Sequence, residues 1–354
     1  MLATIFWDFP NHIPLFGFEL RFYSLMFIIS FVLGQYGMQY IFKKENISPK
    51  LMDSLVYWMI GATIVGARLG HVFFYDWDKY KNNLGDILKV WEGGLASHGA
   101  AIAIVAAMIY WSRKYAKIHP LWTLDRIVIV VALAAGFIRI GNWFNSEIYG
   151  AQANSVFETV FIEDAAQAIK QRFGGDIEDI SFEPSGKVLK KNSLVLPELD
   201  LRISFYQSNE MQTSKYAKDC LGILKGLERE NQNILILENT SVEVYQSPYG
   251  WEASTKVYGI PRYPTQLFEA VAYWFIFIIL TLLYLKRGAG NKAGFLLGLF
   301  LTMLFGFRFF IEFYKEIQVS FENSMSLNMG QWLSIPMVSL GLFLIFRAQK
   351  KYNS

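Results

Sequence analysis

The sequence predicts an all-α polytopic membrane protein with seven transmembrane helices and a small α+β insertion between the fourth and fifth helices. Hydrophobic residues make up 53% of the 354 residues and charged residues only 18%, and the mean hydropathy is +0.26. Soluble domains rarely combine so much apolar content with so little charge. Apolar segments long enough to cross a bilayer core, which takes about 20 helical residues, recur along the chain, and one long charged stretch interrupts them.

The seven predicted spans are residues 18–42, 52–75, 94–112, 123–144, 265–285, 293–313 and 329–347. Lysine and arginine cluster after the first, third, fifth and seventh spans, whereas acidic residues balance them in the alternate loops. Short cytoplasmic loops carry the excess of basic residues. We therefore expect the N-terminus outside and the C-terminus in the cytoplasm. No removable signal peptide is expected, because Asp8 and Glu19 precede the first basic residue, Arg21.

The charged stretch predicts an extracytoplasmic α+β insertion. We expect transmembrane helices 1–4 in residues 1–150, the insertion in 151–262 and helices 5–7 in 263–354. Within the insertion, the pattern predicts strands at 156–162, 177–182, 199–206 and 234–245 and helices at 164–173 and 211–229. That order is typical of a small split βαβ domain. Its second helix contains Cys220, which we interpret as an inert packed thiol.

Few residues suit metal or redox chemistry. A single cysteine excludes an intramolecular disulfide and any multi-cysteine metal site. The four histidines are scattered along the chain. We expect no metal, no cofactor and no nucleic-acid partner.

A polar stripe interrupts the apolar run that ends near residue 137. Arg139, Asn142 and Asn145 follow one another at spacings of three, so they share one face of a helix. Ionisable groups at membrane depth are costly and persist where they pair or have a function. The alternative is an interfacial cap in which Arg139 snorkels toward water.

Polar residues of other predicted spans lie at a similar depth. At a rise of 1.5 Å per residue, Arg68 and Arg139 lie about 24 Å above the cytoplasmic ends of their spans, and Arg308 about 22 Å. Tyr23, His98, Gln266 and Glu269 fall within the first two turns of spans that descend from outside, whereas Glu312 lies slightly above Arg308. A common depth favours one outward-facing site, although helix ends are in general more polar. Guanidinium groups suit phosphate, and a nearby histidine could act as a base.

Seven motifs occur in order along the chain: Phe22-Tyr-Ser-Leu-Met26, Gly66-Ala-Arg-Leu-Gly70, Trp91-Glu-Gly-Gly-Leu-Ala-Ser-His-Gly99, Arg139-Ile-Gly-Asn-Trp-Phe-Asn-Ser-Glu-Ile-Tyr-Gly150, Pro264-Thr-Gln-Leu-Phe-Glu269, Phe305-Gly-Phe-Arg-Phe-Phe-Ile-Glu-Phe313 and Met329-Gly-Gln-Trp-Leu-Ser-Ile-Pro-Met337. Together they resemble the prolipoprotein diacylglyceryl transferase family across all seven spans. Each motif alone is weak, but their order is specific.

The resemblance implies a reaction and a bacterial cytoplasmic (inner) membrane location with the active site toward the outer leaflet. The diacylglyceryl group of phosphatidylglycerol moves to the lipobox cysteine thiol of an exported prolipoprotein, the first step of lipoprotein maturation. His98 is the implied base, and Arg139 and Arg308 are the implied phosphate clamp; thiolate stabilisation by the arginines could make a base unnecessary. Asn142 and Glu147 are implied to position the headgroup or orient Arg139, and Glu312 is implied to orient Arg308. All residues implied in substrate binding are Tyr23, Arg68, Arg139, Asn142, Glu147, Gly150, Gln266, Glu269 and Glu312.

Four positions depart from the family pattern. Ser146 stands where glycine is usual, Ala100 replaces a second glycine, Tyr263 stands where histidine is common, and Lys315 stands where arginine is common. These departures leave room for a specialised paralogue. Two other interpretations remain open, namely an anion or lipid transporter that uses the same arginines, and a membrane anchor for the outside domain.

Overall fold

The computed structural model describes residues 4–15, 18–155, 157–206, 208–227, 233–248, 250–286, 288–316, 322 and 325–353. The first residue of the predicted strand 156–162 and the last two of the predicted helix 211–229 lie outside the described residues. The chain divides into two compact units. The first comprises Met1–Ile28, Gly136–Ala272 and Phe307–Ile335, and the second Ile29–Ala135, Tyr273–Gly306 and Pro336–Ser354.

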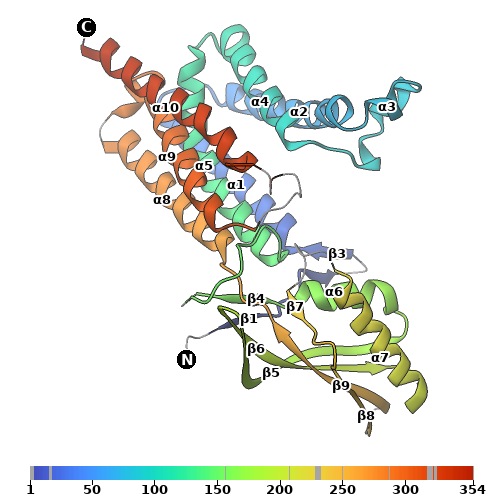
Figure 1. The fold of residues 1–354 in the computed structure, drawn as a ribbon. Coiled ribbons are helices and arrows are strands. Elements are labelled where there is room, and N and C mark those ends of the chain that lie inside the picture. Colours follow the sequence, from blue (N-terminus) through green and yellow to red (C-terminus); the bar gives the residue numbers. More distant parts are fainter. Residues whose placement is uncertain are drawn as a thin grey trace. The chain divides into compact units, whose positions relative to one another are not determined.

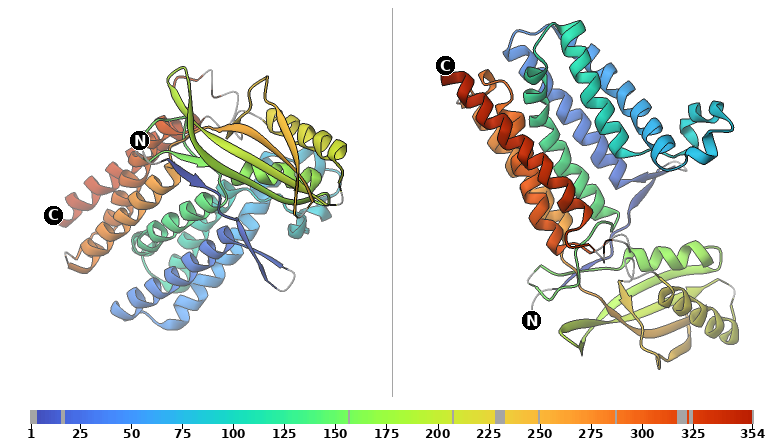
Figure 2. Two further views of the ribbon diagram at one scale, coloured as in Figure 1. Left: turned by 90° about the horizontal axis from the view of Figure 1, so that it is seen from below. Right: turned by 45° about the horizontal axis from the view of Figure 1, so that its top comes forward.

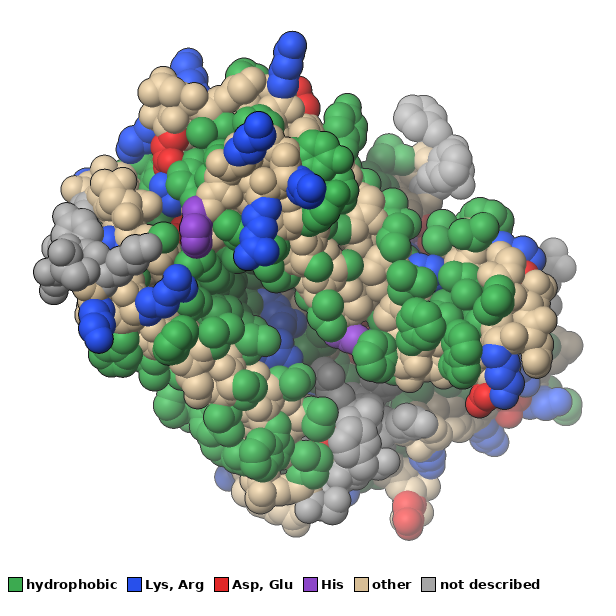
Figure 3. Space-filling model, turned by 90° about the horizontal axis from the view of Figure 1, so that it is seen from above, with side chains coloured by type: hydrophobic (Ala, Val, Ile, Leu, Met, Phe, Trp, Pro, Cys, Tyr) green, Lys and Arg blue, Asp and Glu red, His purple; other side chains and the backbone are tan. Residues whose placement is uncertain are grey.

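Six helices in the described part of the chain are long and apolar enough to cross a membrane (Figure 1). Hydrophobic side chains also cover much of the face drawn in Figure 3, with lysine and arginine projecting among them. Large apolar side chains such as Phe275 and Phe346, 60% and 67% exposed, suit a lipid-facing surface. The protein is therefore a multi-pass membrane protein. The six helices are α1 (Phe22–Lys44), α2 (Pro49–Phe74), α5 (Pro120–Phe144), α8 (Thr265–Lys286), α9 (Phe295–Ile311) and α10 (Met329–Asn353).

The third predicted span corresponds to a shorter helix, α4 (Ser97–Trp111), of 15 residues. At 1.5 Å per residue it covers about 22 Å, which is less than a bilayer core. The expected start at residue 94 is wrong, because Gly93 and Gly94 adopt φ values of 86° and 73° that a helix does not allow. A π-helical turn, Ser112–Ala116, follows the helix. The seventh span thus stays a prediction.

In the second unit, α2 and α4 run side by side (Figures 1 and 2). A Cβ on Gly66 would lie 2.3 Å from Ala103 Cβ, and one on Gly70 would lie 2.7 Å from Gly99 Cα. A Cβ on Gly298 in α9 would similarly lie 2.7 Å from the Gly341 carbonyl oxygen in α10. These glycines allow close helix approach, as small residues do in membrane proteins.

The first unit contains the α+β fold between α5 and α8. Its five-stranded sheet has the order β5 (Ile177–Lys191), β6 (Leu194–Phe205), β9 (Gly250–Gly259) and β7 (Ile234–Leu235), and β8 (Val242–Ser247) also pairs with β9. All of these pairings are antiparallel. The helices α6 (Glu163–Phe173) and α7 (Glu210–Lys225) pack on the sheet (Figure 1), and Ile169, Leu201 and Leu224 lie in the shared core. Alternate residues of β6 are buried, which is the pattern of a sheet with one covered face.

The expected split βαβ topology is wrong. The strand β4 (Thr159–Phe161), which would enter the sheet in that topology, pairs in parallel with the N-terminal strand β1 (Ile5–Trp7). The free edge of β6 is instead taken by β9. The N-terminal segment also forms a hairpin of β2 (His12–Leu15) and β3 (Phe18–Arg21). The boundaries expected at residues 150 and 262 stay predictions.

Cys220 lies fully buried in α7. Burial, followed by the neighbouring Asp219 carboxylate, raises the pKa of its thiol to about 12. A thiol in such a site is inert, which agrees with the packed cysteine expected from the sequence.

Candidate active site

The polar stripe of α5 continues as a hydrogen-bonded series into the loop that follows the helix. Arg139 Nη1 donates to Asn142 Oδ1 at 3.1 Å, and Asn142 Nδ2 donates to Glu147 Oε1 at 2.8 Å. Asn145 Nδ2 donates to the same glutamate oxygen at 3.3 Å. Asn142 is only 4% exposed, so a buried amide joins Arg139 to Glu147. Arg139 and Asn142 therefore share one helix face, as expected from their spacing, and are hydrogen-bonded to each other.

The loop after α5 is strained. Ser146 and Ile148 have φ values of 53° and 57°, a left-handed conformation that is unfavourable for residues other than glycine and an outlier for a β-branched one. The start of α8 holds this loop, since Gln266 Nε2 donates to the Glu147 carbonyl at 2.8 Å and Thr265 Oγ1 donates to the Ile148 carbonyl at 3.2 Å. Strain of this kind is retained where the surroundings enforce it, often at functional sites. The left-handed φ also explains why glycine suits position 146.

Five charged side chains form an alternating series, which we call the ion-pair chain: Arg139, Glu269, Lys315, Glu312 and Arg308. Arg139 Nε lies 3.2 Å from Glu269 Oε2, and Lys315 Nζ lies 3.2 Å from each Glu269 oxygen. Lys315 Nζ also lies 3.3 Å from Glu312 Oε1, which is 3.6 Å from Arg308 Nε. Buried charges are tolerated when they pair in this way.

Exposure varies along the ion-pair chain. Glu269 is 0% exposed and the Lys315 side chain 6%, whereas Arg139 reaches 15% and Arg308 35%. Glu269 was expected to bind substrate, but it is the common counter-ion of two cations. Its role as a direct ligand of the substrate gains no support from this geometry.

Sequence reasoning noted Lys315 only as a departure from arginine and did not include it in the candidate site. It also missed the start of α10. Asn328 Nδ2 donates to Glu312 Oε2 at 3.2 Å, and Gln331 Nε2 donates to the Phe309 carbonyl at 3.4 Å. A Cβ on Gly330 would lie 2.5 Å from Glu312 Cδ. The last of the seven motifs contains Gly330 and Gln331 and was the available signal.

Gly150 and Tyr23 lie beside these groups. The Gly150 amide donates to the Tyr263 carbonyl at 2.8 Å, and a Cβ on Gly150 would lie 2.6 Å from Tyr263 Cβ and 2.7 Å from the Tyr314 carbonyl oxygen. Gly150 is therefore required by close packing of three segments, and this explains its place in the motif. The Tyr23 ring packs on α5, where a Cβ on Gly141 would meet Tyr23 Cδ2 at 2.8 Å.

Arg68 and His98 belong to the second unit, so their expected common depth with Arg139 stays a prediction. Arg68 is 3% exposed, and its guanidinium donates to the backbone carbonyls of Asp86, Ile87, Gly93 and Gly94. Its donors thus hold the loop before α4, and its assignment as a third phosphate ligand stays a prediction. His98 is exposed in the first turn of α4. The centroid of its ring lies 5.2 Å from that of Phe74 and 5.7 Å from that of Tyr75.

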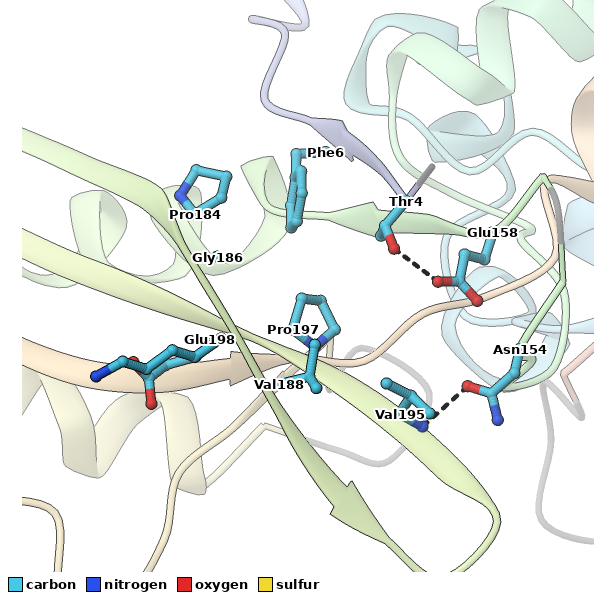
Figure 4. Close-up of a pocket in the computed structure, with 11 residues that line it drawn as sticks. Thr4, Phe6, Asn154, Glu158, Pro184, Gly186, Val188, Val195, Pro197 and Glu198 are labelled. Carbon is cyan, nitrogen blue, oxygen red and sulfur yellow. Dashed lines mark hydrogen bonds between the residues drawn. The ribbon is translucent and has the colours of Figure 1, made fainter. Parts of the chain in front are cut away.

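A separate cavity of about 410 Å³ lies in the first unit, and its lining includes none of the predicted site residues. Figure 4 shows Thr4 facing Glu158 and Asn154 facing Val195 at its edge. Thr4 Oγ1 donates to Glu158 Oε1 at 2.6 Å, and Asn154 Oδ1 accepts from the Val195 amide at 2.9 Å. The first of these contacts joins the N-terminal segment to the stretch between α5 and α8, and the lining of the cavity contains no residue of the ion-pair chain.

The fold and the site define a polytopic membrane protein that pairs arginine and lysine side chains with glutamates near the ends of its helices. A profile of the prolipoprotein diacylglyceryl transferases matches residues 10–347. The phosphatidylglycerol–prolipoprotein diacylglyceryl transferases of Chloroherpeton thalassium and Porphyromonas gingivalis are 32% and 31% identical to this chain; the alignments cover 99% and 98% of it and 96% of each relative. The transferase of Tolumonas auensis is 28% identical, with 98% of each chain covered. The chain belongs to the prolipoprotein diacylglyceryl transferase family.

Proposed function

We propose that this protein transfers the diacylglyceryl group of phosphatidylglycerol to the lipobox cysteine of exported prolipoproteins, at the outer leaflet of the bacterial cytoplasmic membrane. The family match along residues 10–347 supports this reaction. The observation that carries the site assignment is the ion-pair chain, which holds three cations at the ends of membrane helices. We further propose seven spans, with the N-terminus and the α+β fold outside.

The reaction exchanges one bond for another. The thiolate sulfur of the substrate cysteine attacks the glyceryl carbon that carries the phosphate, and a carbon–sulfur bond forms. The bond between that carbon and the phosphate oxygen breaks, and its electron pair leaves with glycerol phosphate. The thiol proton must be removed first, because the thiolate and not the thiol is the nucleophile.

The ion-pair chain suits the leaving phosphate. Arg139 is held by Glu269 and Asn142, so the orientation of its guanidinium is fixed before substrate arrives. Arg308 is the most exposed cation of the ion-pair chain, at 35%, and it is the group best placed to reach an anion. Preorganised cations stabilise developing negative charge more than mobile ones do. We therefore propose Arg139 and Arg308 as the phosphate clamp, with Lys315 as a point charge between them.

His98 is the proposed base for the thiol. Its ring is exposed in the first turn of α4. Stabilisation of the thiolate by the arginines would serve the same step without a base, and a pH–rate profile of His98→Gln separates the two. The family match speaks against the alternative of an anion or lipid transporter.

Purified protein, phosphatidylglycerol vesicles and a lipobox peptide test the function. We expect release of glycerol phosphate and a peptide heavier by one diacylglyceryl group in mass spectra, and neither product from a peptide with serine in place of cysteine. Arg139→Ala should abolish turnover, whereas Arg202→Ala, which removes an exposed arginine on β6, should not. Absence of both products with the cysteine peptide rejects the transferase.

A further inference from the structure

Arg262 is a fully buried arginine outside the ion-pair chain. Its side chain is 0% exposed, and it lies where the α+β fold returns to α8. Withdrawing a guanidinium from water is costly unless hydrogen bonds and an opposite charge compensate. The surroundings of Arg262 supply both.

The guanidinium contacts three parts of the chain. Arg262 Nε donates to Asn233 Oδ1 at 2.7 Å, and Nη1 donates to Glu316 Oε2 at 2.8 Å. Nη1 also lies 3.4 Å from the Gly150 carbonyl oxygen, and the guanidinium stacks over the Tyr149 ring at 4.7 Å. Asn233 belongs to the α+β fold, and its amide also donates to the Tyr149 hydroxyl at 3.1 Å.

Two of these three parts carry the proposed active site. Tyr149 and Gly150 end the strained loop that presents Glu147 to Asn142. Glu316 is the residue after Lys315, the central cation of the ion-pair chain. The backbones also meet here, since the Ala151 amide donates to the Tyr314 carbonyl and the Tyr263 amide to the Ala151 carbonyl, at 2.8 Å and 3.1 Å.

We propose that Arg262 is a positioning residue that fixes the loop ending at Gly150 and the segment carrying Lys315 against the α+β fold. The proposal rests on the proposed function, because the positioned groups are those assigned to the phosphatidylglycerol headgroup. Arg262 touches no reacting atom. It acts through the backbone on either side of the ion-pair chain.

A lysine cannot replace this arginine. An ammonium group keeps the charge, but it lacks the planar fork that reaches Asn233 and Glu316 together and the flat face that stacks on Tyr149. Misplacement of catalytic groups by about 1 Å can cost as much as about 100-fold in rate. The effect should fall on the lipid substrate, since both tethered segments contribute to the cationic site.

The test compares Arg262→Lys and Glu316→Gln with the wild type, and Arg202→Lys serves as a matched arginine-to-lysine control on the exposed surface of β6. We expect Arg262→Lys to raise KM for phosphatidylglycerol at least about fivefold and to lower kcat, with KM for the lipobox peptide unchanged within about twofold. Glu316→Gln should shift the same lipid KM by a smaller factor, and Arg202→Lys should shift neither KM. A loss of folded protein alone lowers the apparent kcat and leaves KM unchanged, so the lipid KM separates positioning from general instability.

A lipid KM that stays within about twofold of wild type in Arg262→Lys overturns the proposal. Where Arg262→Lys does not fold, Glu316→Gln decides by the same criterion. Binding of short-chain phosphatidylglycerol, measured by calorimetry without peptide, provides a readout that does not depend on turnover, and there we expect the same order of variants. If the wild type is active and the variants have an unchanged lipid KM, only the positioning role is rejected. If the wild type neither binds the lipid nor releases glycerol phosphate, the proposed function is rejected as well.

Discussion

The carboxylate of Glu269 lies 3.2 Å from Arg139 Nε, and its side chain is completely withdrawn from solvent. Lys315 Nζ contacts the same carboxylate at 3.2 Å. One buried glutamate therefore fixes two cations, Arg139 and Lys315, that lie far apart in the sequence. This arrangement sets the spacing of the cationic groups before any substrate binds.

Glu269→Gln should uncouple those two cations. The amide keeps the shape and one acceptor, but it removes the charge that balances Arg139 and Lys315. Breaking a buried ion pair costs about 3 kcal/mol or more of unfolding free energy. We expect a lower Tm and at least a tenfold loss of kcat/KM, about 1.4 kcal/mol, in the glycerol phosphate assay.

Glu183→Gln is the matched control, because Glu183 pairs with Arg202 where both side chains are about half exposed, at 55% and 47%. Exposed pairs contribute little, so Tm and turnover should stay close to wild type. Wild-type turnover in Glu269→Gln would contradict the role given to Glu269.

Ser146→Gly should stabilise the protein. Ser146 has a φ of 53°, its side chain is buried, and its Oγ has no hydrogen-bond partner among the described residues. Glycine removes the left-handed penalty of about 1–2 kcal/mol and the unsatisfied hydroxyl, against a loss of about 0.5–1 kcal/mol in backbone entropy. We expect Tm to rise by about 2 °C or more in thermal unfolding, with turnover retained.

Ser146→Ala separates the two contributions. Alanine removes the hydroxyl but keeps the Cβ, so Tm should rise less than in Ser146→Gly. An equal rise in both variants would assign the whole effect to the hydroxyl and contradict the backbone argument.

Gly150→Ala should strongly lower activity. The new Cβ would lie 2.7 Å from the carbonyl oxygens of both Tyr263 and Tyr314, and backbone atoms cannot rotate away as a side chain can. The three segments would have to separate, and the loop that carries Glu147 would move with them. We expect a fall in turnover of about 100-fold. The control is Gly175→Ala, where an added Cβ meets nothing within 4 Å. Equal activity of the two variants would contradict the requirement for close packing of the three segments at Gly150.

Asp164→Asn should stabilise the protein in a pH-dependent way. Burial, followed by repulsion from Glu163 and Glu147, raises the pKa of Asp164 from 3.8 to about 8. The folded state then holds a proton that the unfolded state has released, so the wild type loses stability as the pH rises from about 4 to about 8. Asparagine stays neutral, and its Oδ1 can still accept the Asn233 amide that now bonds Asp164 Oδ2 at 3.2 Å.

The Tm difference between Asp164→Asn and wild type should therefore grow from pH 5 to pH 8 and level off above it. Thermal unfolding at pH 5, 6.5 and 8 measures this trend, with Glu183→Gln as the exposed control. A difference that is constant across this range, or larger at pH 5, would contradict the raised pKa.

The sequence by itself determined the membrane class, and it predicted an α+β fold between the fourth and fifth spans and a set of site residues. Apolar runs and their lengths depend only on local composition, and the spacing of three between Arg139 and Asn142 places them on one helix face whatever surrounds the helix. The ordered motifs supplied the family, which the match along residues 10–347 established. Within the α+β fold, the two helices and the strands β5 and β6 match predicted segments, whereas β9 (Gly250–Gly259) was missed and the predicted strand 234–245 divides into β7 and β8.

Only the tertiary structure decided which polar groups pair. Arg139, Glu269 and Lys315 meet because the ends of α5, α8 and α9 meet, and no local pattern specifies contacts between segments so far apart. The same holds for Arg262, because its neighbours in sequence do not predict its contacts with Asn233 and Glu316. It also holds for Arg68, because the apolar pattern did not predict the structure of the loop whose carbonyls accept its hydrogen bonds. Local sequence fixes the face of a helix on which a charge lies, whereas the partner of that charge depends on the packing of distant segments.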